Sequence, residues 1–309
     1  PEALPTVGTS HGASLRVVDL SNVDEPKLAA TVTLPAGGGH TGLIAQGHRV
    51  LLSHWEPLPG LSGKARFYLD RIDLSNPSGP IALAPINVPG SLVAFDQPSA
   101  NLLTVDYQRE ILPDVLRTTC YETFSHGAQF WPHDEQWWET DDWNTVRGQC
   151  WFMHRKLKLV HVDEINGTAT LLDDHPLPDD LSTSQWLVAD DRVFFTSNPQ
   201  YYDDDGDESL VWVIGGLRAG ELLVHNEALD AAPWAWWQPI EAEGQRLVAW
   251  TWSGGIVTVD AGDLDDLAIE THDTVPWRIS SAEIEGDRAY LSLESYGLRV
   301  VDLDGVPGS

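Results

Sequence analysis

The sequence reads Gly47-His48-Arg49-Val50-Leu51-Leu52-Ser53 at the first clear copy of a phrase that recurs along the chain. In this phrase a turn residue and an arginine precede a short run of alternating apolar residues. A turn followed by short alternation is the pattern of a β-strand with one buried face. Further copies begin at Asp191, Gly244 and Gly286, and a degenerate copy begins at Ser99.

A second phrase follows the first and consists of an apolar strand that ends in an aspartate. Its copies lie at residues 15–21, 69–75, 157–163, 256–260 and 298–303, and a version without the acid lies at 210–214. We expect the aspartate to cap the following turn, because Asp side chains commonly accept a hydrogen bond from the backbone two residues on. This structural role is favoured over a catalytic one.

The spacing of the phrases decides the fold. They recur at roughly 42 to 54 residues, apart from one interval about 40 residues longer, and a period of this size with four short strands is typical of a β-propeller blade. We therefore predict an all-β chain, a β-propeller of about six four-stranded antiparallel blades that forms a single domain over residues 1–309. The first and last blades have fewer of the strand phrases than a complete blade requires. They close by overlap of the termini, or another segment or a partner completes them in a larger assembly.

Residues 15–35 carry the resemblance to a known family. They read Leu-Arg-Val-Val-Asp-Leu-Ser and, after a short turn, Asp-Glu-Pro-Lys-Leu, which resembles the LVIVD-type repeats of bacterial surface proteins. The wider chain is similar to secreted bacterial proteins with a WD-like β-propeller domain. The resemblance covers most of the chain through short phrases. It implies the fold and a location that is secreted, on the cell surface or periplasmic, and it implies no particular activity.

The long interval contains an insertion over residues 109–150, which we predict to be an irregular, Trp-rich loop within one blade. Exposed tryptophans give a large contact area with few rotors, so they can anchor a protein partner or stack on sugar rings. The candidate binding residues are Trp131, Trp137, Trp138 and Trp143, with Trp236 and Trp237 expected near a channel mouth. Alternatively, the tryptophans of the insertion form a small core of their own that covers the propeller.

Cys120 and Cys150 are the only cysteines. A disulfide that closes a loop of about 30 residues stabilises a protein by roughly 3–4 kcal/mol, mostly by restricting the unfolded chain. We expect this disulfide because both cysteines flank a polar, irregular segment. Two unpaired buried thiols are the alternative.

The sharpest local motif is Asp203-Asp204-Asp205-Gly206-Asp207-Glu208. Alternate carboxylates around a glycine turn present several hard oxygens to one ion, which is what calcium requires. The motif predicts a Ca²⁺ site at Asp203, Asp205, Asp207 and Glu208, although Tyr201 replaces the first aspartate of the usual loop. The alternative is an acidic hairpin tip in solvent.

Other candidate sites are weaker. The residues with metal-binding side chains near the insertion match no established ligand spacing; they are His126, His133, Asp134, His154 and His161. The run Gly37-Gly38-Gly39 is followed by His40 where a phosphate loop needs lysine, so we interpret it as a turn between blades. No Gly-x-Ser-x-Gly nucleophile motif is present.

The formal net charge is −29, from 18 Lys and Arg against 47 Asp and Glu. So few cations disfavour nucleic acid as a partner, and no apolar stretch approaches the roughly 20 residues of a membrane span. We expect a non-catalytic extracellular or cell-surface module that binds a protein partner or self-assembles. The alternatives are a metal-dependent hydrolase or oxidoreductase with its site at the propeller channel, and a carbohydrate-binding module that uses exposed tryptophan.

Overall fold

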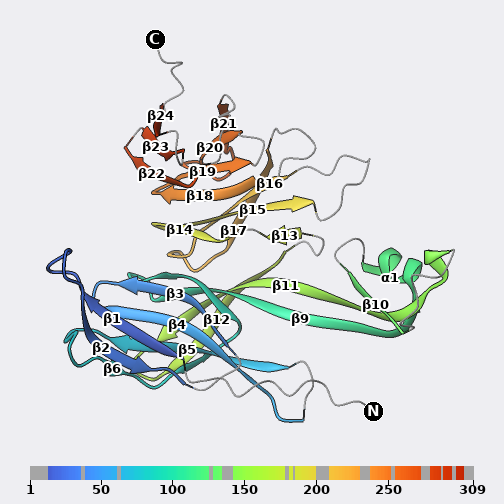
Figure 1. Cartoon of the computed structure of the whole chain (residues 1–309). Coiled ribbons are helices and arrows are strands. Elements are labelled where there is room, and N and C mark those ends of the chain that lie inside the picture. The colour runs from blue at the N-terminus through green and yellow to red at the C-terminus, as the bar shows by residue number, and fades with distance from the viewer. Residues whose placement is uncertain are drawn as a thin grey trace. The chain divides into compact units, whose positions relative to one another are not determined.

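The computed structural model describes residues 13–35, 39–60, 64–124, 128–133, 142–177, 181–183, 185–199, 209–229, 237–251, 255–272, 279–286, 288–293 and 297–302. These residues form six antiparallel sheets, which we name A to F in chain order (Figure 1). Within this part of the chain no helix is long and apolar enough to cross a membrane.

The chain divides into two compact units, which we describe separately. Unit 1 comprises residues 1–106 and 156–174, and unit 2 comprises residues 107–155 and 175–309. Sheets A and B belong to unit 1, and sheets D, E and F belong to unit 2. The single domain over residues 1–309 stays a prediction.

Sheets A and B supply the scaffold of the candidate site described below. Sheet A pairs β1 (Ser14–Asp19) with β2 (Lys27–Thr33). Sheet B consists of β3 (Gly39–Gln46), β4 (Arg49–Pro57), β5 (Ala65–Asp73), β6 (Ile81–Ala82) and β7 (Ile86–Val88). Because β6 and β7 both pair with β5, they act together as an interrupted fourth strand, and the sheet is a four-row blade.

Sheet C carries the insertion. It consists of β8 (Ser91–Asp96), β9 (Asn101–Leu116), β10 (Gln129–Pro132), β11 (Arg147–Asp163) and β12 (Thr168–Leu177). Its order is β10-β11-β9-β8, with β12 pairing β11. The far ends of β9 and β11, together with β10, α1 (Arg117–Phe124) and η3 (Trp143–Thr145), form what we call the arm.

The described part of the arm is more regular than the irregular loop that the sequence indicated. Gly148, Cys150 and Phe152 are buried at alternate positions of β11, which is the period of a strand. This period continues that of the blade strand, so β9 and β11 extend as one long hairpin. The prediction of a loop was wrong here because it was based on the tryptophan and proline content of the segment and not on this alternation.

Unit 2 contains three further sheets. Sheet D consists of β13 (Leu181–Thr183), β14 (Leu187–Ala189), β15 (Arg192–Pro199), β16 (Leu210–Gly215) and β17 (Leu223–Ala228), with β13 and β14 both pairing β15. Sheet E consists of β18 (Trp237–Glu243), β19 (Arg246–Thr251), β20 (Ile256–Asp260) and β21 (Ala268–His272). Sheet F consists of β22 (Ser281–Glu285), β23 (Arg288–Ser292) and β24 (Leu298–Asp302).

Neighbouring sheets pack face to face within each unit. In unit 1, Val32 of sheet A packs with Val50 of sheet B, and Leu51 of sheet B packs with Leu102 of sheet C. In unit 2, one buried cluster joins sheets D and E and another joins sheets E and F. Small antiparallel sheets that stack in chain order are the blades of a β-propeller, so the predicted all-β propeller class is confirmed.

The two sequence phrases occupy equivalent strands in successive sheets. The turn-arginine phrase forms the second strand of sheets B, D, E and F, and the apolar-aspartate phrase forms the third strand of sheets B, C, E and F. The expected capping role of the aspartate is confirmed: Asp19, Asp73 and Asp163 each accept a backbone hydrogen bond from the residue two positions on, at 2.8, 2.8 and 3.0 Å. Hydrogen bonds from the capped turns hold the pKa of all three carboxyls below its usual value.

Candidate metal centre

Three strands of sheet B place two histidines and an aspartate on one face. The register pairs His40 of β3 directly with His54 of β4, and pairs His54 with Tyr68 of β5. Asp70 follows Tyr68 by two positions, so it points to the same face of the sheet. We call His40, His54 and Asp70 the His-His-Asp cluster.

This face of sheet B is the one that packs against sheet A. Val50 and Leu52 alternate with His54 along β4, and both lie in the buried cluster that contains Val32 and Leu34. Consequently His54 is only 1% exposed and Asp70 5%. Polar groups at such depth need specific partners, because burial without them costs free energy.

The contacts of His54 fix the orientation of its ring. Its Nδ1 lies 2.6 Å from Oδ2 of Asp70, a short and buried hydrogen bond. The ring of Tyr68 stacks on His54 at 5.0 Å between centroids and an angle of 17°, and the His40 ring lies 5.7 Å away. An imidazole held by a carboxylate and an aromatic ring is preorganised in one rotamer.

His40 supplies the unusual feature of the cluster. Its Nε2 atom is buried and has no hydrogen-bond partner among the described residues. Burial lowers the pKa of the His40 imidazole, although the nearby Asp70 carboxylate opposes that effect. The lowered pKa favours the neutral imidazole, which has a lone pair available on one nitrogen.

Asp70 experiences opposing influences. Burial raises the pKa of its carboxyl, while the hydrogen bond from His54 and the nearby imidazoles lower it. Glu56 lies at the edge of the same face, with its Oε1 3.7 Å from Nε2 of His54 and its side chain 48% exposed. Carboxylates thus lie near both nitrogens of the His54 ring.

The donor set fits a divalent transition metal. Each member of the cluster offers one ligand atom, and these atoms lie within 4.8 Å of one another. Two imidazole nitrogens and one carboxylate oxygen suit Zn²⁺, and the same set is used for Fe²⁺. Calcium, which takes six to eight oxygen ligands, does not suit it. The cluster is the one group of three or more such side chains found within the described ranges.

The sequence analysis did not identify this cluster. The separations along the chain are those of strand pairing rather than of a helix or loop motif, and His40 attracted notice only as a departure from a phosphate loop. A comparison of the repeats would have found it. Five residues after the arginine of the turn phrase, sheets D, E and F have Ser197, Thr251 and Leu293, where sheet B has His54.

The predicted calcium ligands Asp203, Asp205, Asp207 and Glu208 lie outside the described residues. The candidate tryptophans Trp137, Trp138 and Trp236 also lie outside them. The calcium site therefore stays a prediction.

The structure contradicts the prediction that Trp237 lies near a channel mouth. It is 1% exposed and packs with Val211 and Leu247 in the core between sheets D and E. Because its ring fills the space between two blades, Trp237 stabilises their packing and is not a ligand platform at a channel mouth.

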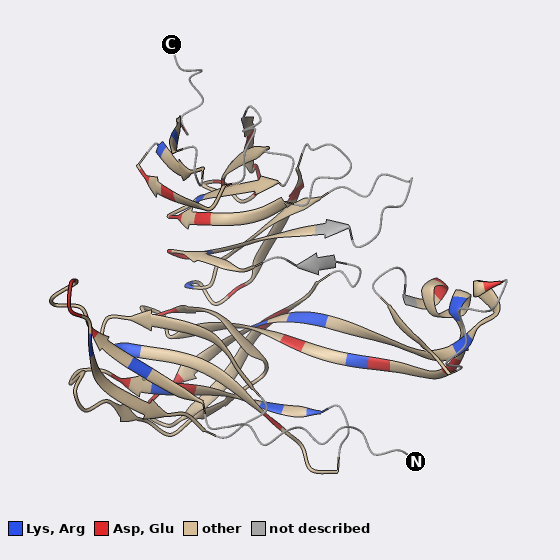
Figure 2. Ribbon diagram, in the orientation of Figure 1, with Lys and Arg blue, Asp and Glu red and all other residues tan. Residues whose placement is uncertain are grey.

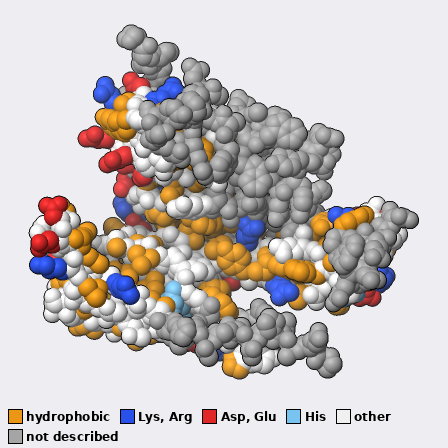
Figure 3. All heavy atoms as spheres, in the orientation of Figure 1, with side chains coloured by type: hydrophobic (Ala, Val, Ile, Leu, Met, Phe, Trp, Pro, Cys, Tyr) orange, Lys and Arg blue, Asp and Glu red, His pale blue; other side chains and the backbone are white. Residues whose placement is uncertain are grey.

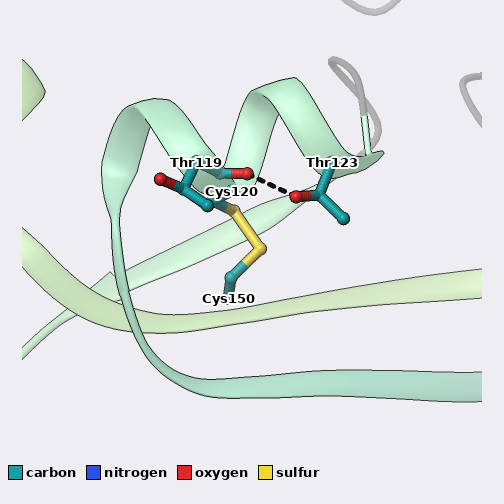
Figure 4. Close-up of a disulfide and its surroundings, with 4 residues drawn as sticks. All are labelled: Thr119, Cys120, Thr123 and Cys150. Carbon is teal, nitrogen blue, oxygen red and sulfur yellow. Dashed lines mark hydrogen bonds between the residues drawn. A yellow bond between two sulfur atoms is a disulfide. The ribbon is translucent and has the colours of Figure 1, made fainter.

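The predicted disulfide is confirmed. Cys120 of α1 is bonded to Cys150 of β11, with 5.6 Å between their Cα atoms (Figure 4). Both cysteines are fully buried, and Phe152, Leu112 and Tyr121 pack around them. The arm therefore has a small core of its own around the disulfide, and the described part of this core contains no tryptophan, unlike the tryptophan core of the alternative interpretation.

Two candidate tryptophans of the arm stay accessible. Trp131 is 62% exposed and Trp143 is 42% exposed. The guanidinium of Arg117 lies 5.4 Å from the centroid of the Trp143 ring, a cation–π contact. Hydrophobic side chains also line the visible face of the arm in Figure 3.

The charges of the arm are of both signs, as Figure 2 shows along β9 and β11. Arg147 binds Asp114 through two hydrogen bonds of 2.9 and 2.8 Å, and His133 lies 3.7 Å from the same carboxylate. His154 lies 3.1 Å from Glu110. These histidines have separate partners, so with His161, which contacts Asn101, they form no common site. His126 and Asp134 lie outside the described residues.

The chain was compared with protein families, curated protein sequences and solved structures. Neither the protein-family models nor the curated protein sequences include a match. Among solved structures, the chain is similar to an acylaminoacyl peptidase from Pyrococcus horikoshii, with a TM-score of 0.43 and 11% identity over 91% of this chain and 40% of the peptidase. It is similar to the β-propeller domain of the Trilobed protease from Pyrococcus furiosus (TM-score 0.34, 8% identity, 86% and 83% covered) and to apo AztD from Citrobacter koseri (0.39, 12%, 94% and 75%).

Proposed function

We propose that the protein is an exported β-propeller that binds a divalent transition-metal ion, with zinc as the first candidate, at the His-His-Asp cluster. The single observation that carries the proposal is the buried Nε2 of His40, which has no hydrogen-bond partner among the described residues and lies beside His54 and Asp70. A metal ion would satisfy that nitrogen and compensate for the burial of the carboxylate.

Burial of the cluster favours binding over catalysis. With His54 1% and Asp70 5% exposed, a substrate has little access to a metal held between them. This supports the non-catalytic role expected from the sequence. A metal-dependent hydrolase or oxidoreductase would need an open coordination position that reaches solvent.

Export is part of the proposal. The buried disulfide is typical of proteins from oxidising compartments. The resemblance to LVIVD-type repeats and to secreted bacterial propeller proteins supports the same location. A secreted, cell-surface or periplasmic protein meets free metal ions that cytosolic buffers would otherwise hold.

The test uses the full chain, freed of metal by a chelator and titrated with Zn²⁺ by calorimetry. We expect one tight site, and we expect His40→Ala and His54→Ala to weaken zinc binding by at least about 100-fold, because each removes one of three ligands. His48→Ala, which removes an exposed histidine from the turn between β3 and β4, is the matched control and should bind like the wild type. Equal affinities in all four proteins would refute the proposal, as would an absence of binding. Parallel titrations with Fe²⁺ without oxygen and with Ca²⁺ identify the metal.

A second candidate function is recognition of a protein partner or a glycan by the arm. The favouring observation is that Trp131 and Trp143 stay exposed although the disulfide fixes the neighbouring helix. Rigid aromatic side chains of this kind anchor contacts at low cost in conformational entropy. Sedimentation velocity and a glycan array, each with wild type and Trp131→Ala, test this role. Self-association or glycan binding that survives the substitution would argue against it.

A further inference from the structure

The two ring nitrogens of His54 have different surroundings. Nδ1 lies 2.6 Å from Asp70 inside the cluster, and Nε2 faces Oε1 of Glu56 at 3.7 Å. A neutral imidazole carries one proton, so one nitrogen donates a hydrogen bond while the other offers a lone pair. The carboxylate that accepts the hydrogen bond of the ring N–H therefore decides which nitrogen keeps a lone pair for a metal.

Glu56 is well placed for this task. It follows His54 by two positions on β4, so both side chains lie on the same face of sheet B. Its side chain is 48% exposed, whereas that of His54 is 1% exposed. The Glu56 carboxylate thus stays in contact with water while it reaches the buried ring from the edge of the sheet.

We infer that Glu56 is an outer-sphere residue of the metal site, which accepts the Nε2–H of His54 and leaves Nδ1 free to bind the ion beside Asp70 and His40. This inference rests on the proposed metal-binding function. With an ion at Nδ1, the N–H of the His54 ring would be on Nε2, where Glu56 would accept its hydrogen bond. Oδ2 of Asp70, which lies 2.6 Å from Nδ1, would then be available to hold the same ion.

The role has a clear physical basis. A ligand histidine that donates its second N–H to a carboxylate has a fixed orientation and a more basic coordinating nitrogen. The distance of 3.7 Å between Oε1 of Glu56 and Nε2 of His54 is longer than a hydrogen bond. We expect the separation to close by several tenths of an ångström when the ring proton moves to Nε2.

Zinc affinity of the full chain, measured by competition with a chelator, tests the inference. Loss of such a carboxylate typically weakens metal binding 10- to 100-fold, and we expect about 10-fold for Glu56→Ala because the side chain is half exposed. Glu56→Gln should lose less, since its amide oxygen still accepts a hydrogen bond. Glu25→Gln makes the same change of charge at an exposed turn of unit 1 and should leave the affinity unchanged.

A spectroscopic measurement separates this role from general support of the fold. In the zinc-bound protein, labelled with ¹⁵N histidine, the His54 ring should carry its proton on Nε2. A proton on Nδ1, or wild-type affinity in Glu56→Ala, overturns the inference while the proposed function stands. A changed ligand-field spectrum of the Co²⁺ form in Glu56→Gln also overturns it, because Glu56 would then be a direct ligand. If the wild type binds no zinc, both the inference and the proposed function fail.

Discussion

Sheets B and E are built from the same two sequence phrases, yet they use equivalent positions for different purposes. In sheet B the register pairs His40 with His54, and in sheet E it pairs Trp237 with Thr251. The third strand continues the contrast: Leu52 lies opposite Asp70, and Ala249 lies opposite Val257.

The difference shows what a repeated blade leaves free to vary. In sheet E, Trp237, Ala249 and Val257 all lie in one buried apolar cluster, which stabilises the packing of sheets D and E. In sheet B, His40 and Asp70 stand at the positions of Trp237 and Val257, His54 stands at the position of Thr251, and only Leu52, at the position of Ala249, stays apolar. The register of a blade brings side chains of three strands together in either case, so a metal-capable site needs no special fold, only metal-binding side chains at these positions.

The first way to sharpen this comparison is to truncate the equivalent residues of the first strands. Trp237→Ala should destabilise unit 2 by about 3–5 kcal/mol, because it leaves a cavity in a closely packed core. His40→Ala in the metal-free protein should cost about 1 kcal/mol, the ordinary effect of a point substitution. Denaturant unfolding of both variants measures the difference. Equal losses would mean that His40 serves packing as Trp237 does.

The second way compares the stabilisation by zinc of the wild type with that of a variant that lacks a histidine of sheet B. Free zinc at 100 times its dissociation constant should stabilise the wild type by about 2.7 kcal/mol, because the ion binds the folded chain alone. His54→Thr, which installs the residue of sheet E, should abolish that gain. Unfolding with and without zinc gives the result. A zinc effect that persists in His54→Thr would place the ion elsewhere.

The third concerns a feature that the blades share, and its effect is the smallest. The hydrogen bonds from Ser75 lower the pKa of Asp73 from its ordinary value of 3.8. A group with a lowered folded-state pKa contributes stability above its unfolded pKa and loses that contribution as the pH falls through the folded value. Asp73→Ala should therefore be less stable than wild type near pH 6 and should lose less stability on acidification.

Urea unfolding at a series of pH values between 3 and 6 measures this slope. Asp24→Ala, which changes an exposed aspartate in the turn between β1 and β2, is a suitable control for the loss of one negative charge. Identical pH profiles for the wild type and Asp73→Ala would show that the capping hydrogen bond contributes no stability.

The sequence predicted local structure well because its signals are local. The alternation of apolar residues after Arg49 and Arg246 indicates strands with one buried face. The aspartate at the end of the third strand of a blade indicates a capped turn. The disulfide between Cys120 and Cys150 was expected because both cysteines flank a polar segment, and the structure contains it. The course of the arm was not, because aromatic content obscured the period of two in β11.

By itself the amino-acid sequence determined the repeat, the strand phrases and the class of blade, since each depends on patterns within a few neighbouring residues. The tertiary structure alone decided which chemical groups meet. His40, His54 and Asp70 lie on three neighbouring strands, and only the pairing register, which shifts between Thr41 and Leu43, brings them to one face. A shift of one residue would reverse the facing of a strand, so side-chain proximity in a sheet follows from hydrogen-bond register and not from spacing along the chain.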